Sequence, residues 1–336
     1  MKTARWVVSA SLLIAVVAGA AAIAAYAWLH RPLALAATPV ELSIEPGSSP
    51  RQIADGWVGA GVDVSPTVLY EWFRWSGQAR RIRAGSYEVE TGTTPIGLLE
   101  KMVRGDESAA TVRFNEGWTF RQFRAELARA EALKPTTAAM SDAEIMAALG
   151  APGVSPEGRF HPDTYAYSKG TTDLAVLKRA HRAMGQRLAL AWQERAPDSP
   201  LHDADEALTL ASIVEKETGV ESDRGLVAGV LVNRLRRGMP LQTDPSVIYG
   251  LGPAFDGNLR KRDLLADTPY NTYTRTGLPP TPIAAPGKAA LLAAVRPEPT
   301  KALYFVARGD GSSEFSENLA DHNRAVNRFQ RKTSSP

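Results

Sequence analysis

The stretch Ala211-Ser-Ile-Val-Glu-Lys-Glu217 combines an apolar helical pattern with acidic side chains. Successive residues of an α-helix are about 100° apart, so Leu210, Ile213 and Val214 share one face. On the same scale Glu217 lies only about 20° from Leu210. The pattern therefore predicts a core helix whose last carboxyl group points into the middle of its buried face.

A carboxyl group on an apolar face is costly unless it is neutral or paired with a cation. Desolvation raises the pKa of such a group, and a raised pKa is what a general acid needs near neutral pH. The alternative is a structural ion pair between Glu217 and Arg234 on the following helix, and the pattern alone leaves both open. Glu215 and Lys216 fall on the flanks of the apolar face, and we expect them to be supporting or surface charges.

The composition is that of an ordinary globular chain of 336 residues, 44% apolar and 22% charged. Its 39 basic and 36 acidic side chains nearly balance, which gives little support for a nucleic-acid partner. The absence of cysteine excludes disulfides, thiolate nucleophiles and cysteine-bound zinc, and the five histidines are not spaced as metal ligands. We therefore expect neither a metal nor a cofactor. Two arginine clusters are expected to be solvated faces: Arg80, Arg81 and Arg83, and Arg234, Arg236 and Arg237.

Residues 6–29 contain no charged side chain. As a helix they would measure about 36 Å, enough to cross a hydrocarbon core of about 30 Å. Lys2 and Arg5 precede this segment, so the positive-inside rule predicts a cytoplasmic N-terminus and an exported bulk. A cleaved signal peptide is the alternative, because small residues follow the segment. Its apolar length favours a retained anchor.

The rest of the chain predicts an α+β protein in two parts. We expect a cytoplasmic tip and anchor at residues 1–30, a tether at 31–39, a small α/β module at 40–107 and a larger mixed domain at 108–332. Strands are expected at residues 41–44, 84–89 and 111–115, and helices at 50–60, 66–75, 95–103 and 120–130. Ser141 opens a further helix with a capping-box sequence, and Asp173 opens a long one.

Several later segments suit a carbohydrate. Asp244 precedes Pro245 at a helix start, where capping is its plain role, although it is also the best candidate for a second carboxylate. Tyr270-Asn-Thr-Tyr273 opens a polar-aromatic, proline-rich stretch, and such residues can stack on sugar rings and pair with hydroxyls. Irregular surface structure is the alternative for this stretch. A hairpin is expected around Arg308-Gly-Asp-Gly311, with Asn318 starting the final helix.

The motifs of serine hydrolases, penicillin-binding transpeptidases and P-loop proteins are absent from the sequence. Taken together, the chain resembles the YceG-like family of endolytic murein transglycosylases. The resemblance rests on segments that run in the family order: Ala84-Gly-Ser-Tyr87, Pro162-Asp-Thr-Tyr165, Ala211 to Thr218, Val232-Asn-Arg-Leu235, Leu241 to Gly250, Tyr270 to Tyr273 and Gly277-Leu-Pro-Pro280. One departure is Arg159 and His161, where we expect apolar or aromatic residues in relatives.

The resemblance implies a LysM-like N-terminal module and a catalytic domain with a lysozyme-like catalytic helix. It implies that Glu217 is the acid and base of a lyase, which cleaves the MurNAc-GlcNAc β-1,4 bond within nascent glycan strands. The product would be a 1,6-anhydroMurNAc end that terminates elongation. Residues expected to bind substrate are Gln242, Thr243, Asp244, Tyr249, Asn271, Tyr273 and Asn318.

The expected partners are peptidoglycan glycan strands, the membrane through residues 6–29, and peptidoglycan synthases of the elongation or division machinery. The expected location is the bacterial inner membrane, with one span and a periplasmic bulk. Two other functions stay open: a lysozyme-like muramidase that uses Glu217 with Asp244, and a non-catalytic scaffold that binds peptidoglycan.

Overall fold

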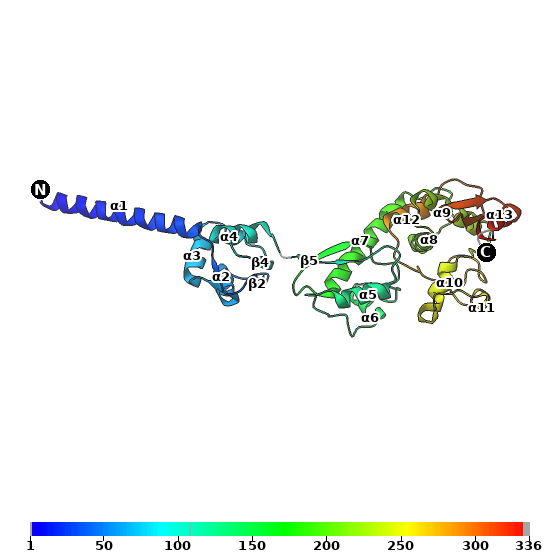
Figure 1. Cartoon of the computed structure of the whole chain (residues 1–336), viewed down its shortest axis with the longest axis horizontal. Coiled ribbons are helices and arrows are strands. Elements are labelled where there is room, and N and C mark those ends of the chain that lie inside the picture. Colours follow the sequence, from blue (N-terminus) through cyan, green and yellow to red (C-terminus); the bar gives the residue numbers. More distant parts are fainter. Residues whose placement is uncertain (1, 108, 332–336) are drawn as a thin grey trace. The chain divides into compact units, whose positions relative to one another are not determined.

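The computed structural model describes residues 2–107 and 109–331, and it begins with one uninterrupted helix (Figure 1). This helix, α1 (Lys2–Leu29), includes the window Leu12–Leu29, whose mean hydropathy is 2.3 and which is not buried against the rest of the chain. Its length and composition are those of a helix that can cross a membrane.

The chain divides into two compact units. The first runs to Ala110 and includes Ala166–Gly170, and the second holds Thr111–Tyr165 and the chain from Thr171 onward. A strand pair, β5 (Ala109–Arg113) with β6 (Thr164–Ser168), lies where the division falls.

The first unit builds a small core around one antiparallel strand pair, β2 (Val40–Ile44) with β4 (Gly85–Val89). Trp57 is fully buried there and its indole N–H points to the Met102 sulfur at 3.2 Å. A second pair, β1 (Ala34–Leu35) with β3 (Val62–Asp63), lies partly in the expected tether, so residues 34–35 are a strand. The remaining elements are α2 (Pro50–Ala60), α3 (Pro66–Trp75), the 3₁₀ turn η1 (Ala79–Arg81) and α4 (Pro95–Arg104).

The helices of the first unit begin where the sequence places a capping residue before a proline. Ser49 caps α2 and Thr94 caps α4, each through its hydroxyl, and a proline follows at the first helical position. The predicted helices at residues 50–60 and 66–75 are confirmed.

The second unit is mainly helical, and its core is the helix α8 (Ala204–Glu217). The helices that pack most closely against it are α12 (Lys288–Val295), α9 (Glu221–Arg236) and α7 (Asp173–Gln193), and α10 (Asp244–Leu251) touches it as well. Leu210, Ile213 and Val214 are fully buried, as predicted. Every residue from Ala207 to Val214 is buried, however, so α8 is covered on all sides and has no solvated face along this stretch.

The other elements of this unit surround that core. They are α5 (Phe120–Arg129), α6 (Asp142–Ala148), α10 (Asp244–Leu251), η2 (Gly252–Ala254), α11 (Lys261–Leu265), α13 (Leu319–Val326) and the π-helical turn η3 (Asn327–Arg331). The predicted C-terminal hairpin is confirmed as the antiparallel pair β7 (Tyr304–Ala307) and β8 (Ser313–Ser316). The strand β6 and the helix α12 were not predicted, because neither shows a clear apolar period.

Candidate active site

The helix α8 ends so that its last side chain reaches a cavity. Asp203 caps its N-terminus by accepting a hydrogen bond from the Glu206 amide. At the other end Thr218 adopts an extended conformation, although its amide still reaches the Val214 carbonyl at 3.3 Å. Glu217 is therefore the final helical residue, half-buried, at the point where the backbone leaves the core.

Glu217 lines a cavity of about 590 Å³. Its polar wall holds Arg234, Gln242, Asp244 and Tyr273. Facing residues come from the β7–β8 hairpin and the last helices: Tyr304, Phe305, Val306, Ala307, Ser313, Leu319, His322, Asn323, Val326 and Gln330. A cavity of this size is within the range of about 300–1,000 Å³ that holds small ligands.

Burial raises the pKa of Glu217 to about 7. The negative charge of Asp244 is a second, smaller cause of this rise, and the guanidinium of Arg234 lowers the pKa. Within the described part of the chain, the Glu217 carboxyl makes no hydrogen bond or ion pair that would hold it ionised. The group can therefore carry a proton near neutral pH, as a general acid must.

Arg234 is a buried structural residue, which corrects its assignment to a solvated cluster. Its guanidinium donates hydrogen bonds to the carbonyl oxygens of Leu303 (2.7 Å), Leu241 (2.9 Å) and Pro240 (3.2 Å), and to Gln242 Oε1 (3.1 Å). It forms no ion pair with Glu217 within 4.0 Å, and its Nε and Nη1 atoms instead donate to backbone carbonyls and to Gln242. The structural alternative for Glu217, a pair with Arg234, is therefore wrong.

Asp244 is the first residue of α10, and the N-cap position belongs to Thr243. The expected capping role of Asp244 is therefore wrong. Its Oδ1 accepts a hydrogen bond from the Tyr273 hydroxyl at 2.6 Å, and burial raises the pKa of Tyr273. These two side chains, 29 positions apart in the sequence, form one wall of the Glu217 cavity.

Gln242 and Thr243 link this wall to the loop that follows α11. Gln242 has a left-handed backbone (φ 54°), and its amide donates to the Thr272 carbonyl at 2.9 Å. Thr243 is fully buried, and its amide donates to the Thr272 hydroxyl at 2.9 Å. Gln242 therefore presents its side chain to the cavity, whereas Thr243 supports the backbone beneath it.

Three other expected substrate-binding residues lie outside the lining of the Glu217 cavity. Tyr249 lines a second cavity, where its hydroxyl donates to Glu157 Oε2 at 3.1 Å. Asn318 is the N-cap of α13 and accepts from the Asp321 amide at 3.0 Å. The side-chain amide of Asn271 donates to the carbonyls of Asp263, Leu264 and Ala266.

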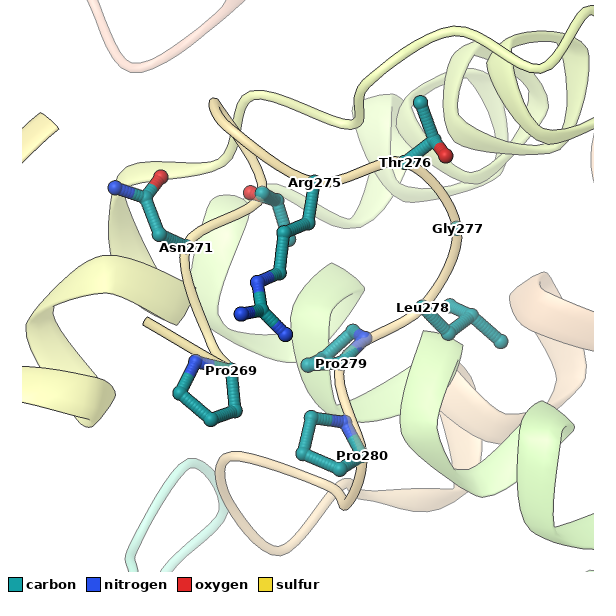
Figure 2. A pocket seen from close by; sticks show the side chains of 9 residues that line it. Pro269, Asn271, Arg275, Thr276, Gly277, Leu278, Pro279 and Pro280 are labelled. Carbon is teal, nitrogen blue, oxygen red and sulfur yellow. The ribbon is translucent and has the colours of Figure 1, made fainter. Parts of the chain in front are cut away.

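The Asn271 loop encloses a smaller pocket of about 270 Å³. Figure 2 shows the Arg275 guanidinium pointing into the space bordered by the proline-bearing arms of this loop. Arg275 also pairs with Asp267 at 2.7 Å. The loop is thus held by its own contacts. The role of Asn271 in them is to tie the loop to the end of α11 by donating hydrogen bonds to the backbone carbonyls there.

Comparison with known proteins places this site in a family. The sequence model described as the YceG-like family matches residues 42–328. The chain belongs to the YceG-like family. The match covers Glu217 and all seven expected substrate-binding residues.

Relatives of this YceG-like chain carry an enzyme name. A Bacillus subtilis protein named endolytic murein transglycosylase is 30% identical over 309 residues, covering 87% of this chain and 85% of that protein. A Streptococcus pneumoniae protein of the same name is 28% identical, and the alignment covers 85% of this chain but 58% of that protein. A crystal structure of a YceG-like protein from Listeria monocytogenes aligns with a TM-score of 0.54 and 28% identity, over 85% of this chain and 98% of that one.

In this YceG-like chain Glu215 is half-buried, so of the two expected positions, a supporting or a surface charge, the structure favours the supporting one. Its Oε2 accepts from the Gly287 amide at the start of α12, at 2.9 Å. Burial raises the pKa of Glu215, and the nearby Glu116 adds to this effect. Glu215 therefore joins the end of α8 to the start of α12.

Glu157 is a second buried carboxyl group, and no pattern in the sequence predicts it. It accepts hydrogen bonds from the Phe120 amide (3.0 Å) and the Tyr249 hydroxyl (3.1 Å), and burial raises its pKa to about 7. The neighbouring Arg159, noted as a departure from relatives, pairs with Asp205 at 2.6 Å. His161 is buried, and burial lowers its pKa to about 4. No group of three or more acidic, histidine or cysteine side chains suited to a metal occurs among the described residues.

Proposed function

We propose that this chain is an endolytic murein transglycosylase in which Glu217 alone serves as acid and base. The observation that carries the proposal is the pKa of about 7 for a carboxyl group that opens into a cavity of about 590 Å³. Relatives named endolytic murein transglycosylase support the same reaction class.

The proposed reaction moves one proton through one carboxyl group. Protonated Glu217 donates its proton to the oxygen that leaves MurNAc C1, and the C1–O bond breaks. The resulting carboxylate takes the proton of the C6 hydroxyl of the same sugar as O6 bonds to C1. Glu217 is protonated again, and the product carries a 1,6-anhydro ring without the addition of water.

Because the nucleophile already belongs to the sugar, the protein has to supply position and charge rather than a second nucleophile. A glycoside hydrolase ordinarily uses two carboxylates. In our proposal Asp244 raises the pKa of Glu217 and holds Tyr273, while Gln242 and Tyr273 orient the sugar. Thr243, Asn271 and Asn318 shape the loops behind these groups.

The proposed location of the enzyme is the surface of a bilayer. We propose that α1 anchors the chain in the bacterial inner membrane with a cytoplasmic N-terminus and a periplasmic bulk, next to peptidoglycan synthases. Residues 40–107 would be a LysM-like module that contacts glycan, after the anchor at 1–30 and the tether at 31–39. The catalytic domain would be 108–332, with α8 as its lysozyme-like helix; the boundary residues 1, 108 and 332 lie outside the described part.

The test is mass spectrometry of glycan strands digested by the wild-type protein. The proposal predicts 1,6-anhydroMurNAc ends within long strands, and no such ends with Glu217→Gln. Reducing ends would instead identify a muramidase that uses Asp244 as its second carboxylate. Binding to strands without any released fragment would identify a non-catalytic scaffold.

A further inference from the structure

The second cavity of this unit lies directly beside the first and is larger, about 870 Å³. Consecutive residues form the border between the two. Lys216 lines the second cavity and Glu217 the first, while Pro245 lines the second and Asp244 the first. A glycan strand that is cut internally must extend to both sides of the cleaved bond. The second cavity borders the Glu217 cavity, so it is in a position to hold the part of the glycan strand on one side of that bond.

The wall of the second cavity offers aromatic and polar groups to a sugar. Tyr249 and Tyr270 meet edge to face, with ring centroids 4.9 Å apart, and Phe255 also lines this wall. Rings of this kind bind the apolar faces of sugars, and tyrosine hydroxyls pair with sugar hydroxyls. Glu157 holds Tyr249 in place through the hydrogen bond to its hydroxyl.

Two cations of this cavity, Arg121 and Lys216, form no ion pair within 4.0 Å with any residue that the structure describes. Arg121 is exposed in the first turn of α5, where a positive charge opposes the helix dipole and does not stabilise the helix. Lys216 is exposed too, and among the described residues its ammonium donates one hydrogen bond, to the Gly117 carbonyl at 3.4 Å. The one acidic side chain of the lining besides Glu157 is Asp142, which pairs with Arg124 at 2.7 Å. The cavity is therefore suited to an anion.

We propose that this second cavity binds the saccharide next to the cleaved bond together with its stem peptide, whose carboxylates pair with Arg121 and Lys216. The inference rests on the proposed function. The sugars of a glycan strand carry no charge once the lactyl group is joined to a peptide, so the carboxylates belong to the peptide. The cavity thus selects peptide-bearing strands over peptide-free strands whose lactyl carboxylates are masked as neutral amides.

The test measures binding by the full chain in detergent with Glu217→Gln, which keeps the strands intact. Two probes are compared: purified glycan strands with stem peptides, and the same strands after an amidase has removed the peptides and the freed lactyl carboxylates have been coupled to methylamine, which leaves neutral amides. We expect Arg121→Gln to weaken binding of the peptide-bearing strands about two- to fivefold, the range for an exposed ion pair. Binding of peptide-free strands should not change.

Arg129→Gln is the matched control, because Arg129 is an exposed arginine on the same helix outside the cavity. It should leave both affinities unchanged. An equal effect of Arg121→Gln on both probes, or no effect on either, would overturn the inference. A third outcome would also overturn the inference: inorganic pyrophosphate competes with strand binding in the parent protein but not in Arg121→Gln, and neither protein prefers peptide-bearing strands. The cations would then belong to a site for a phosphate-bearing ligand.

Binding does not depend on the chemistry at Glu217, so this result is separate from the reaction class. A peptide preference with reducing-end products would retain the inference and reject the proposed reaction. Anhydro products without a peptide preference would do the reverse.

Discussion

Removing the charge of Asp244 should move the alkaline limb of the pH–rate profile of glycan cleavage, the pH range over which kcat/KM falls, to lower pH. With a pKa of about 7, Glu217 is about half protonated at pH 7 and about one-tenth protonated at pH 8. The wild-type kcat/KM should therefore fall about fivefold between pH 7 and pH 8, and about tenfold for each further pH unit. Asp244→Asn keeps an oxygen for the Tyr273 hydroxyl but removes the charge that raises the pKa of Glu217.

The assay is the initial rate of strand cleavage from pH 5 to pH 9 at low substrate, at constant ionic strength. Asp256→Asn is the control for lost charge, since Asp256 is exposed and pairs with Arg260 at 2.6 Å. It should leave the limb in place. Glu157→Gln should also leave it in place, although the pKa of Glu157 is likewise about 7. A limb that stays fixed in Asp244→Asn, or disappears in Glu157→Gln, would refute Glu217 as the titrating acid.

Three further predictions concern the residues that support the site. The folded state raises the pKa of Glu157 from 4.5 to about 7, so the stability from its protonation is complete below pH 4.5 and is lost as the pH rises through 7. In the wild type, the free energy of unfolding should therefore fall between pH 5 and pH 8, and Glu157→Gln should remove up to about 3 kcal/mol of this fall. Denaturant titration at each pH measures it, and an equal fall in both proteins would contradict the prediction. Arg234→Met should lower the free energy of unfolding by about 2–4 kcal/mol, because the carbonyls of Leu303 and Leu241 lose their donor. It should also shift the alkaline limb to higher pH, because Arg234 lowers the pKa of Glu217. A variant that is as stable as the wild type and has an unmoved limb would count against both expectations. Gly229→Ala should lower the free energy of unfolding by about 1–3 kcal/mol, since its Cβ would lie 2.7 Å from the Glu298 carbonyl oxygen. Gly185→Ala in α7 meets no atom within 4 Å and should raise the free energy of unfolding by about 0.5–1 kcal/mol. Equal melting temperatures of the two variants would contradict this description of the packing.

The sequence predicts features that depend on neighbours along the chain. Helix starts at Pro50 and Pro66 follow from a serine before a proline, and the inward direction of Glu217 follows from its spacing to Leu210. Asp244 shows the limit of such reasoning. The sequence predicts a helix start at Pro245, but α10 begins one residue earlier and its cap is Thr243. The hydrogen bond that defines the role of Asp244 comes from Tyr273, 29 positions away.

Features that depend on distant segments could not be predicted from one sequence. Glu215 falls on the flank of α8 by periodicity, yet it is half-buried because α12 packs there and Gly287 donates to it from 72 positions away. Glu157 lies in a loop without any periodic pattern. Its burial arises only when α5 and α10 come together, through the Phe120 amide and the Tyr249 hydroxyl.

The central claim is that one carboxyl group, Glu217, closes the C6 hydroxyl of MurNAc onto its own C1. The most direct measurement is mass spectrometry of wild-type digestion products formed in water labelled with ¹⁸O. The account predicts 1,6-anhydroMurNAc ends that contain no ¹⁸O, and no new ends with Glu217→Gln. Reducing ends labelled with ¹⁸O at C1 would contradict it, because they would show that water attacks the sugar.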